Sequence, residues 1–93
     1  MSEKVRLKAI VHGRVQGVNF RYYTCQQARG LGVTGYVRNR WDGTVEAVAE
    51  GERDMVVRLL NWLHKGPRVA FVEKVDAQWL PYSGEFRGFE VRY

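Results

Sequence analysis

The apolar side chains of this chain switch between two spacings, and the order of the switches limits the folds that it can adopt. In residues 5–11 apolar and charged side chains alternate, interrupted only by Ile10, which indicates a strand with one buried face. Residues 20–31 place apolar or small side chains at helical spacing, and Gly30 and Gly32 mark the end of that helix. The chain therefore begins with a strand followed by a helix.

The same two spacings recur in the rest of the chain. Residues 33–39 and 44–50 read as two strands, and the Asp42-Gly43 turn between them is a strong hairpin signal. Residues 52–65 form an amphipathic pattern that Gly66 and Pro67 end, which predicts a second helix. Residues 69–80 read as a long strand in which Phe71, Val75, Ala77 and Trp79 share one face, and residues 89–93 suggest a short closing strand.

This order is strand, helix, strand, strand, helix, strand, with a short fifth strand at the end. It predicts an α+β fold of the ferredoxin-like βαββαβ type, in which two helices cover one face of an antiparallel sheet of four to five strands. The right-handed crossover rule places the first and third strands side by side in the centre. At 93 residues, we expect a single domain spanning residues 1–93.

The charge and the single cysteine restrict the classes of function. A formal net charge of +5 suits an anionic ligand, and it would also suit RNA or a membrane surface, although no run of four basic residues occurs. Cys25 is the only cysteine, so we expect a packed thiol without an internal disulfide. Nothing approaches the ~20 apolar residues that span a bilayer, and no signal region is apparent, so we expect a cytoplasmic protein.

Residues 13–21, Gly-Arg-Val-Gln-Gly-Val-Asn-Phe-Arg, connect the first strand to the first helix. Two glycines let the backbone turn sharply and point its N–H groups at one centre, next to the positive end of the helix dipole. Arg21 adds a guanidinium that binds anions with two hydrogen bonds. The spacing alone leaves two interpretations: a cradle for a phosphate or carboxylate, or an ordinary turn followed by a solvated arginine. The loop lacks the patterns of nucleotide and dinucleotide loops.

Two stretches together resemble the signatures of the acylphosphatase family. Residues 13–21 are similar to the first signature, and Gly-Tyr-Val-Arg-Asn at 35–39, followed by Asp42, Gly43, Val45 and Gly51, is similar to the second. The order, the separation and the ending Gly-Phe-Glu-Val at 88–91 also fit. Asn19 departs from the motif, which often has glycine or an aromatic residue there, and Arg40 and Trp41 occupy a variable turn.

The resemblance implies hydrolysis of an acyl phosphate to a carboxylate and inorganic phosphate, without a metal or an organic cofactor. It implies that Arg21 binds the phosphate together with the backbone of residues 15–20, namely Val15, Gln16, Gly17, Val18, Asn19 and Phe20. It implies that Asn39 positions the attacking water. The expected partners are a small acyl phosphate and phosphate or sulfate as product or mimic, and we expect a monomer that binds neither nucleic acid nor a membrane.

Alternatives to these roles remain open at this stage. Asn39 shares strand parity with Val37, which predicts a position near Arg21, but an amide there can also serve only to hold a turn. His12 could act as a nucleophile in a phosphoenzyme route, although a solvated or hydrogen-bonded histidine is the favoured interpretation. Tyr22 and Tyr23 could line the site, although packing on the helix surface or in the core is the favoured interpretation, and the three tryptophans are expected to pack or to lie exposed on a turn.

The rival class of function is a non-catalytic module that binds RNA or a phosphorylated ligand on a ferredoxin-like sheet. Such a sheet places aromatic side chains in its two central strands, where bases stack on them. Residues 5–11 and 44–50, the expected central strands, contain no Phe, Tyr or Trp. The sequence therefore favours the enzyme over the RNA-binding module.

Overall fold

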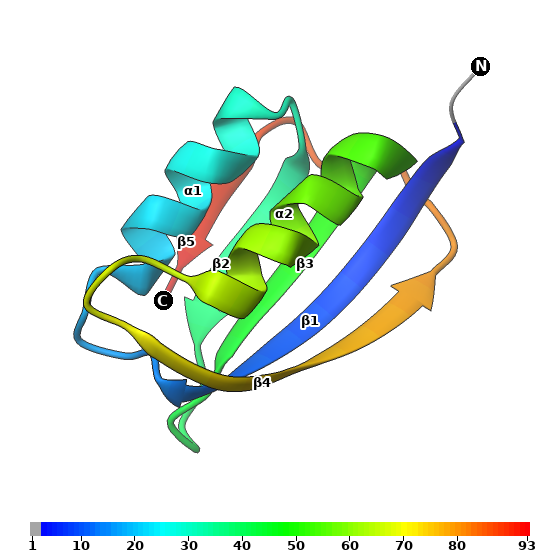
Figure 1. The fold of residues 1–93 in the computed structure, drawn as a ribbon. Coiled ribbons are helices and arrows are strands. Elements are labelled where there is room, and N and C mark those ends of the chain that lie inside the picture. The colour runs from blue at the N-terminus through cyan, green and yellow to red at the C-terminus, as the bar shows by residue number, and fades with distance from the viewer. Residues whose placement is uncertain (1–2) are drawn as a thin grey trace.

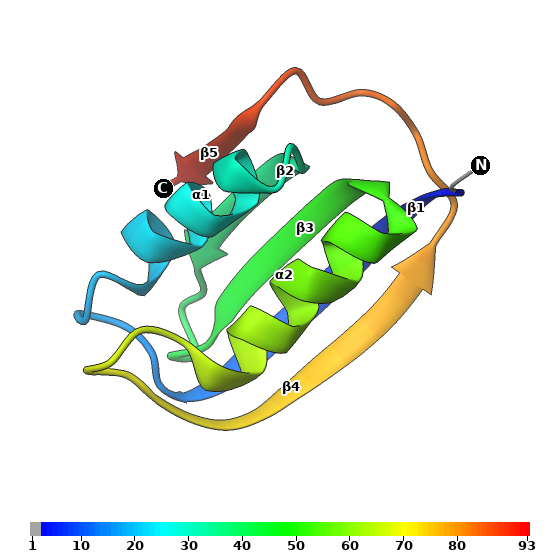
Figure 2. The ribbon, with the colours of Figure 1, turned by 45° about the horizontal axis from the view of Figure 1, so that its top comes forward.

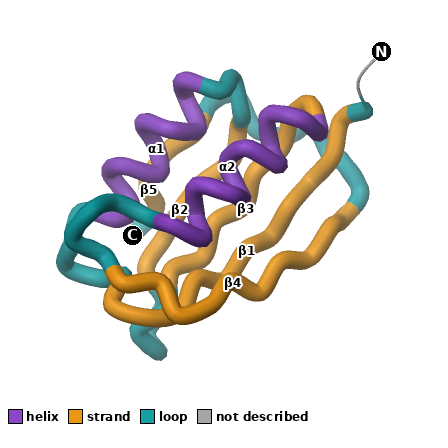
Figure 3. Tube along the Cα trace, viewed as in Figure 1, coloured by secondary structure: helices purple, strands orange, loops and turns teal. Residues whose placement is uncertain are grey.

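The computed structural model describes residues 3–93 as one five-stranded sheet with two helices on one face (Figures 1 and 3). The strands follow the order β4-β1-β3-β2-β5 across the sheet, so β1 and β3 are central, as predicted. This arrangement confirms the ferredoxin-like α+β fold. The elements are β1 (Lys4–Arg14), α1 (Phe20–Gly30), β2 (Thr34–Asn39), β3 (Val45–Glu52), α2 (Arg53–Lys65), β4 (Phe71–Leu80) and β5 (Phe89–Arg92).

The core lies between the sheet and the two helices. The alternating apolar side chains of β1 are all buried beneath the helices, which confirms the strand with one buried face. Side chains of both helices meet them, as the helical spacing predicts. The buried side chains of this layer include Val5, Leu7, Ala9 and Val11 from β1, Phe20, Cys25 and Ala28 from α1, and Val56, Leu59 and Leu63 from α2.

The fifth strand joins the sheet in a different direction from the other four. β1, β2, β3 and β4 pair antiparallel, whereas β5 pairs parallel to β2, so the complete sheet is mixed. β4 and β5 lie on opposite edges, and the segment 81–88 runs from one edge to the other (Figure 2). The chain crosses to the other edge of the sheet before it pairs again, and β5 therefore runs parallel to β2 rather than antiparallel to it.

The outer strand β4 corrects one detail of the sequence interpretation. The strand begins at Phe71 rather than at residue 69, and Phe71 does not share a face with Val75. The register shifts between His12 and Gly13, so that Val72 lies opposite Gly13 and Phe71 lies opposite Arg14. This irregularity moves Val72 against the core and leaves Phe71 64% exposed, because one extra residue reverses the side-chain parity of a strand.

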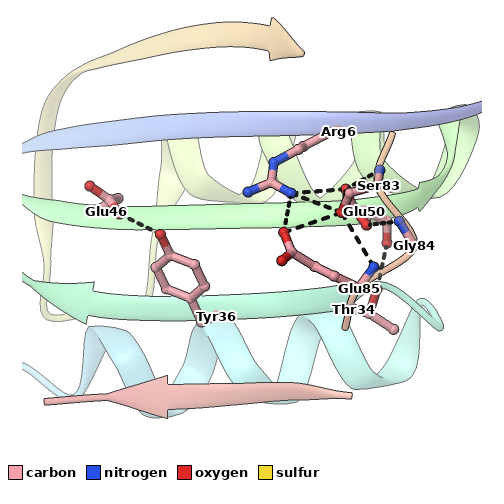
Figure 4. A network of polar contacts seen from close by, with 8 residues as sticks. All are labelled: Arg6, Thr34, Tyr36, Glu46, Glu50, Ser83, Gly84 and Glu85. Carbon is pink, nitrogen blue, oxygen red and sulfur yellow. Dashed lines mark hydrogen bonds and ion pairs between the residues drawn. The ribbon is translucent and has the colours of Figure 1, made fainter. Parts of the chain in front are cut away.

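The other face of the sheet holds a buried carboxylate. Glu50 of β3 is fully buried and accepts hydrogen bonds from the N–H groups of Ser83 and Gly84, from the Ser83 hydroxyl and from Arg6 (Figure 4). Burial by itself raises the pKa of Glu50, but these donors together hold that pKa below its ordinary value. Glu50 thereby fastens the segment that leads to β5 onto the sheet.

Replacement of this carboxylate should destabilise the protein in a pH-dependent way. A carboxyl group whose folded pKa is lowered stabilises the fold above its unfolded pKa of about 4.3, and that stabilisation disappears as the pH falls through the lower folded pKa. We expect Glu50→Gln to lower the free energy of unfolding by about 1–3 kcal/mol at pH 7. Urea unfolding at pH 7 and at pH 3 measures this difference in the free energy of unfolding, with the exposed Glu73→Gln as control. An equal deficit at both pH values would contradict this role.

Candidate functional site

The loop between β1 and α1 is shaped by residues that tolerate positive φ. Gly17 has φ +75° and Asn19 has φ +60°, both in the left-handed region, which glycine adopts without strain and which asparagine tolerates better than most other residues. At the base of the loop, a Cβ on Gly13 would collide with the carbonyl oxygen of Phe71. Asn19 therefore has a backbone conformation that glycine adopts without strain.

The amide groups of this loop have no hydrogen-bond partner among the described residues. Within residues 3–93, none of the N–H groups of residues 15–19 donates a hydrogen bond to a backbone or side-chain acceptor. Free donors that precede the N-terminus of α1 are favourable for an anion, because the helix dipole adds partial positive charge there. The loop therefore has the hydrogen-bonding capacity that the sequence predicts.

Gln16 fixes the loop against the β2–β3 turn. Its side-chain Nε2 donates to the carbonyl oxygens of Arg40, at 2.7 Å, and Thr44, at 2.9 Å. Asp42 closes the same turn by accepting from the N–H and the hydroxyl of Thr44. The Gln16 side chain therefore links the first motif to the second. The sequence does not indicate this contact, because the partners are backbone atoms 24 and 28 residues away.

A cavity of about 530 Å³ opens beside the loop. Of the predicted site residues, Val15, Gly17, Asn19, Phe20, Arg21 and Asn39 line it. Gln16 and Val18 do not: the side chain of Gln16 holds the turn, and Val18 packs against the core. The structure thus brings Arg21 and Asn39, which are 18 positions apart in the sequence, to one cavity. We refer to it as the Arg21 cavity.

Arg21 lies in the first turn of α1, where a cation is unfavourable for the helix dipole. Its guanidinium carbon lies 5.0 Å from the centre of the Tyr93 ring, which provides a cation–π contact. Within residues 3–93 Arg21 makes no ion pair. Its charge is therefore held in place by an aromatic ring and is available to an anion.

Asn39 is the last residue of β2, and its carbonyl oxygen Oδ1 is buried without a hydrogen-bond partner. Among the described side chains, this is the sole buried polar atom in that state. Leaving such an atom unpaired costs about 1–3 kcal/mol. An amide whose only role was to hold the turn would therefore be hydrogen-bonded to the turn. The parity argument correctly predicted that Asn39 lies near Arg21, since both residues line the same cavity.

Several residues that the sequence interpretation did not assign to the site also line the cavity. Tyr22, Cys25, Gln26 and Arg29 lie along α1, and Val91 and Tyr93 come from the C-terminal end of the described chain. The positions 22, 25, 26 and 29 share one helix face with the start of the site, so their spacing could have indicated that these four helix residues line the cavity. Nothing local could have suggested Val91 and Tyr93. Cys25 is buried, as expected, and burial, which the Arg29 charge only partly offsets, raises the pKa of its thiol.

The other singled-out side chains lie elsewhere. His12 Nε2 lies 2.9 Å from Asp76 Oδ2, and His12 is not part of the cavity, which agrees with the hydrogen-bonded interpretation. Trp62 packs against Phe20 with 5.7 Å between ring centres, and Trp79 lies under Arg53. Trp41 is 96% exposed on its turn.

In the described part of the chain, no three His, Cys, Asp or Glu side chains cluster as metal ligands, and neither helix is long and apolar enough to cross a membrane.

Comparisons with known proteins agree with this geometry. A relative from Pelotomaculum thermopropionicum named acylphosphatase is 50% identical over 97% of this chain and 98% of its own length. The crystal structure of an acylphosphatase from Bacillus subtilis superposes with a TM-score of 0.92 at 30% identity, covering 96% of this chain and 99% of that one. The acylphosphatase from Coxiella burnetii gives 0.91 at 38% identity, covering 96% and 93%. The family model for acylphosphatases matches residues 7–91, and the chain belongs to the acylphosphatase family.

Proposed function

We propose that this acylphosphatase cleaves the carboxyl-phosphate bond by direct in-line attack of a water that Asn39 positions, while Arg21 and the N–H groups of residues 15–20 hold the phosphate. The products are a carboxylate and inorganic phosphate. The observation that carries the proposal is the unpaired, buried Oδ1 of Asn39 at the cavity that Arg21 also lines. An amide with unused hydrogen-bonding capacity beside a free cation suits a water next to a phosphate.

The phosphate would be held by charge and by the loop. The free N–H groups of residues 15–19 and the guanidinium of Arg21 are suited to the equatorial phosphoryl oxygens, on which charge is spread in the transition state. Each well-aimed donor of this kind contributes about 3 kcal/mol, by analogy with an oxyanion hole. Positioning and charge stabilisation can therefore supply most of the acceleration.

The leaving group needs little help. The carboxylate of an acyl phosphate has a pKa of about 4–5, so it departs without being protonated. This agrees with the cavity lining, which contains no Asp, Glu or His. The site is therefore suited to an activated phosphate and poorly suited to an alkyl phosphate ester, whose alkoxide must be protonated as it leaves.

The water would be held by Asn39. A side-chain amide accepts and donates, so it can fix a water in line with the bond that breaks. An amide does not act as a base at neutral pH, and the proton is expected to pass to an oxygen of the substrate's own phosphate. All the atoms that react then belong to the water and the acyl phosphate.

Two rival mechanisms receive less support. A phosphoenzyme route through His12 is disfavoured because this imidazole is bound to Asp76 and does not line the cavity. An RNA-binding sheet is disfavoured because the central strands carry no aromatic residue and β3 carries the carboxylates of Glu46 and Glu50.

For the remaining properties we propose a monomer that binds neither nucleic acid nor a membrane. We place it in the cytoplasm, where the buried free thiol of Cys25 stays reduced.

A hydrolysis assay on metal-stripped protein tests the proposed function. We expect the purified protein to hydrolyse benzoyl phosphate at an unchanged rate after dialysis against a strong chelator, because Arg21 and the loop supply the positive charge that a metal would otherwise supply. The release of inorganic phosphate is followed with and without added Mg²⁺ or Zn²⁺. Turnover that disappears on chelation and returns with either ion would contradict the mechanism.

A further inference from the structure

We propose that Arg29 forms a second anion-binding position at the far end of the Arg21 cavity, so that the preferred substrates are acyl phosphates whose acyl group carries a second carboxylate or phosphate. The inference rests on the proposed function, because it assumes that the phosphoryl group occupies the Arg21 end. It assigns the remainder of the cavity to the acyl group.

The cavity extends along α1 from one arginine to the other. Arg21, Cys25 and Arg29 follow one another at intervals of four residues, on one side of the helix, and all three line the cavity. Eight residues of α-helix span about 12 Å. An acyl phosphate with its phosphate at Arg21 therefore points its acyl group toward Arg29.

The facing wall is β5, which runs beside α1 in the opposite direction (Figures 1 and 2). Two contacts fix this pairing at its two ends. Arg21 lies over the ring of Tyr93, just after β5, and Arg29 Nε donates a 3.0 Å hydrogen bond to the carbonyl oxygen of Phe89, at the start of β5. The cavity between them has a cation at each end.

The charge of this cavity is not compensated by its lining. Arg21 and Arg29 are its ionised side chains, and none of the other lining residues is acidic. Within residues 3–93 neither arginine takes part in an ion pair, although Arg6, Arg38, Arg40 and Arg53 all do. A cavity lined by two arginines outside ion pairs and by no acidic side chain favours a ligand with two anionic groups over a ligand with one, although the nearby Glu90 charge, which also helps to raise the pKa of the Cys25 thiol, reduces this effect.

The contact to Phe89 prepares Arg29 for this role. It occupies Nε and holds the guanidinium, while the two terminal nitrogens make no hydrogen bond to the described residues. An anchored guanidinium loses less side-chain entropy when it binds a carboxylate. Between the two arginines the lining contains Cys25 and Val91, which suit the carbon skeleton of the acyl group.

Two probes with matched leaving groups test the inference: benzoyl phosphate, and 4-carboxybenzoyl phosphate, which adds a carboxylate at the far end of the ring. We expect the parent to show a kcat/KM about fivefold higher for the carboxylated probe, mainly through KM, since an exposed charge pair contributes up to about 1 kcal/mol. The preference should shrink as the salt concentration rises.

Arg29→Gln should abolish the preference and leave kcat/KM for benzoyl phosphate within about twofold of the parent. Arg29→Lys should keep part of the preference, because it retains the charge but loses the planar anchor. The control Arg58→Gln removes an equal charge from an exposed position on α2 outside the cavity, and should preserve the preference.

Three results would overturn the inference while leaving the proposed function intact: equal efficiency of the parent on both probes, a preference that survives in Arg29→Gln, or an equal loss on both probes in a folded Arg29→Gln. The last would show that Arg29 only joins α1 to β5. If Arg29→Gln does not fold, Arg29→Lys and the salt dependence of the parent decide the matter. Failure of the parent to hydrolyse either probe would instead overturn the proposed function and the inference together.

Discussion

Arg21→Gln should give a folded protein that has lost at least about a thousandfold in kcat/KM for benzoyl phosphate, the upper range for removing one donor from a charge-stabilising site. The loss should be this large because the guanidinium supplies both a charge and two parallel donors to the phosphoryl group. Binding of inorganic phosphate, followed by calorimetry in the same variant, should fall steeply as well. The fold should survive, because Arg21 makes no ion pair within residues 3–93 and its described aromatic contact is to the exposed Tyr93.

Two companion variants make this result specific. Arg21→Lys keeps the charge without the planar pair of donors, so it should recover part of the phosphate affinity and little of the rate. Arg58→Gln, on the exposed face of α2, lowers the net charge equally and should behave like the parent. A folded Arg21→Gln protein that binds phosphate as tightly as the parent would show that the phosphate lies elsewhere.

Asn39→Ala should lower kcat about a hundredfold while phosphate affinity remains close to that of the parent, because a misplaced nucleophile costs about that much. The lost interaction would be one made with the attacking water in the transition state, so it appears in kcat rather than in product binding. Single-turnover hydrolysis and phosphate calorimetry on the same preparation measure both quantities.

The stability of the same variant separates this role from a structural one. The Asn39 side chain makes no hydrogen bond within residues 3–93, and its Oδ1 is buried without a partner. Its removal should therefore not lower the free energy of unfolding by more than about 1 kcal/mol, as at the exposed control Asn61→Ala. A folded Asn39→Ala protein that keeps near-parent kcat would remove Asn39 from the mechanism, and a large loss of stability would favour a turn-holding role.

Local sequence patterns were enough to predict most of the elements of this protein and to bring Arg21 and Asn39 to one cavity. Alternation in residues 5–11 and the helical spacing after Phe20 predicted β1 and α1, because burial on one face imposes those periods locally. The shared parity of Asn39 and Val37 predicted that Asn39 turns toward the helix side of the sheet, where Arg21 lies in the first turn of α1. These predictions required only local periodicity and the order of elements.

Other features of the fold and the cavity depend on contacts between distant parts of the chain. The parallel pairing of β5 with β2 brings Val91 and Tyr93 to the cavity, and the register shift beside Gly13 reverses the facing of Phe71. The buried hydrogen bonds of Glu50 depend on a segment 33 residues away. Local periodicity cannot specify such contacts, because the same alternation is compatible with either strand direction and with more than one register. They are settled only when the strands pair and the segment 81–88 crosses the sheet.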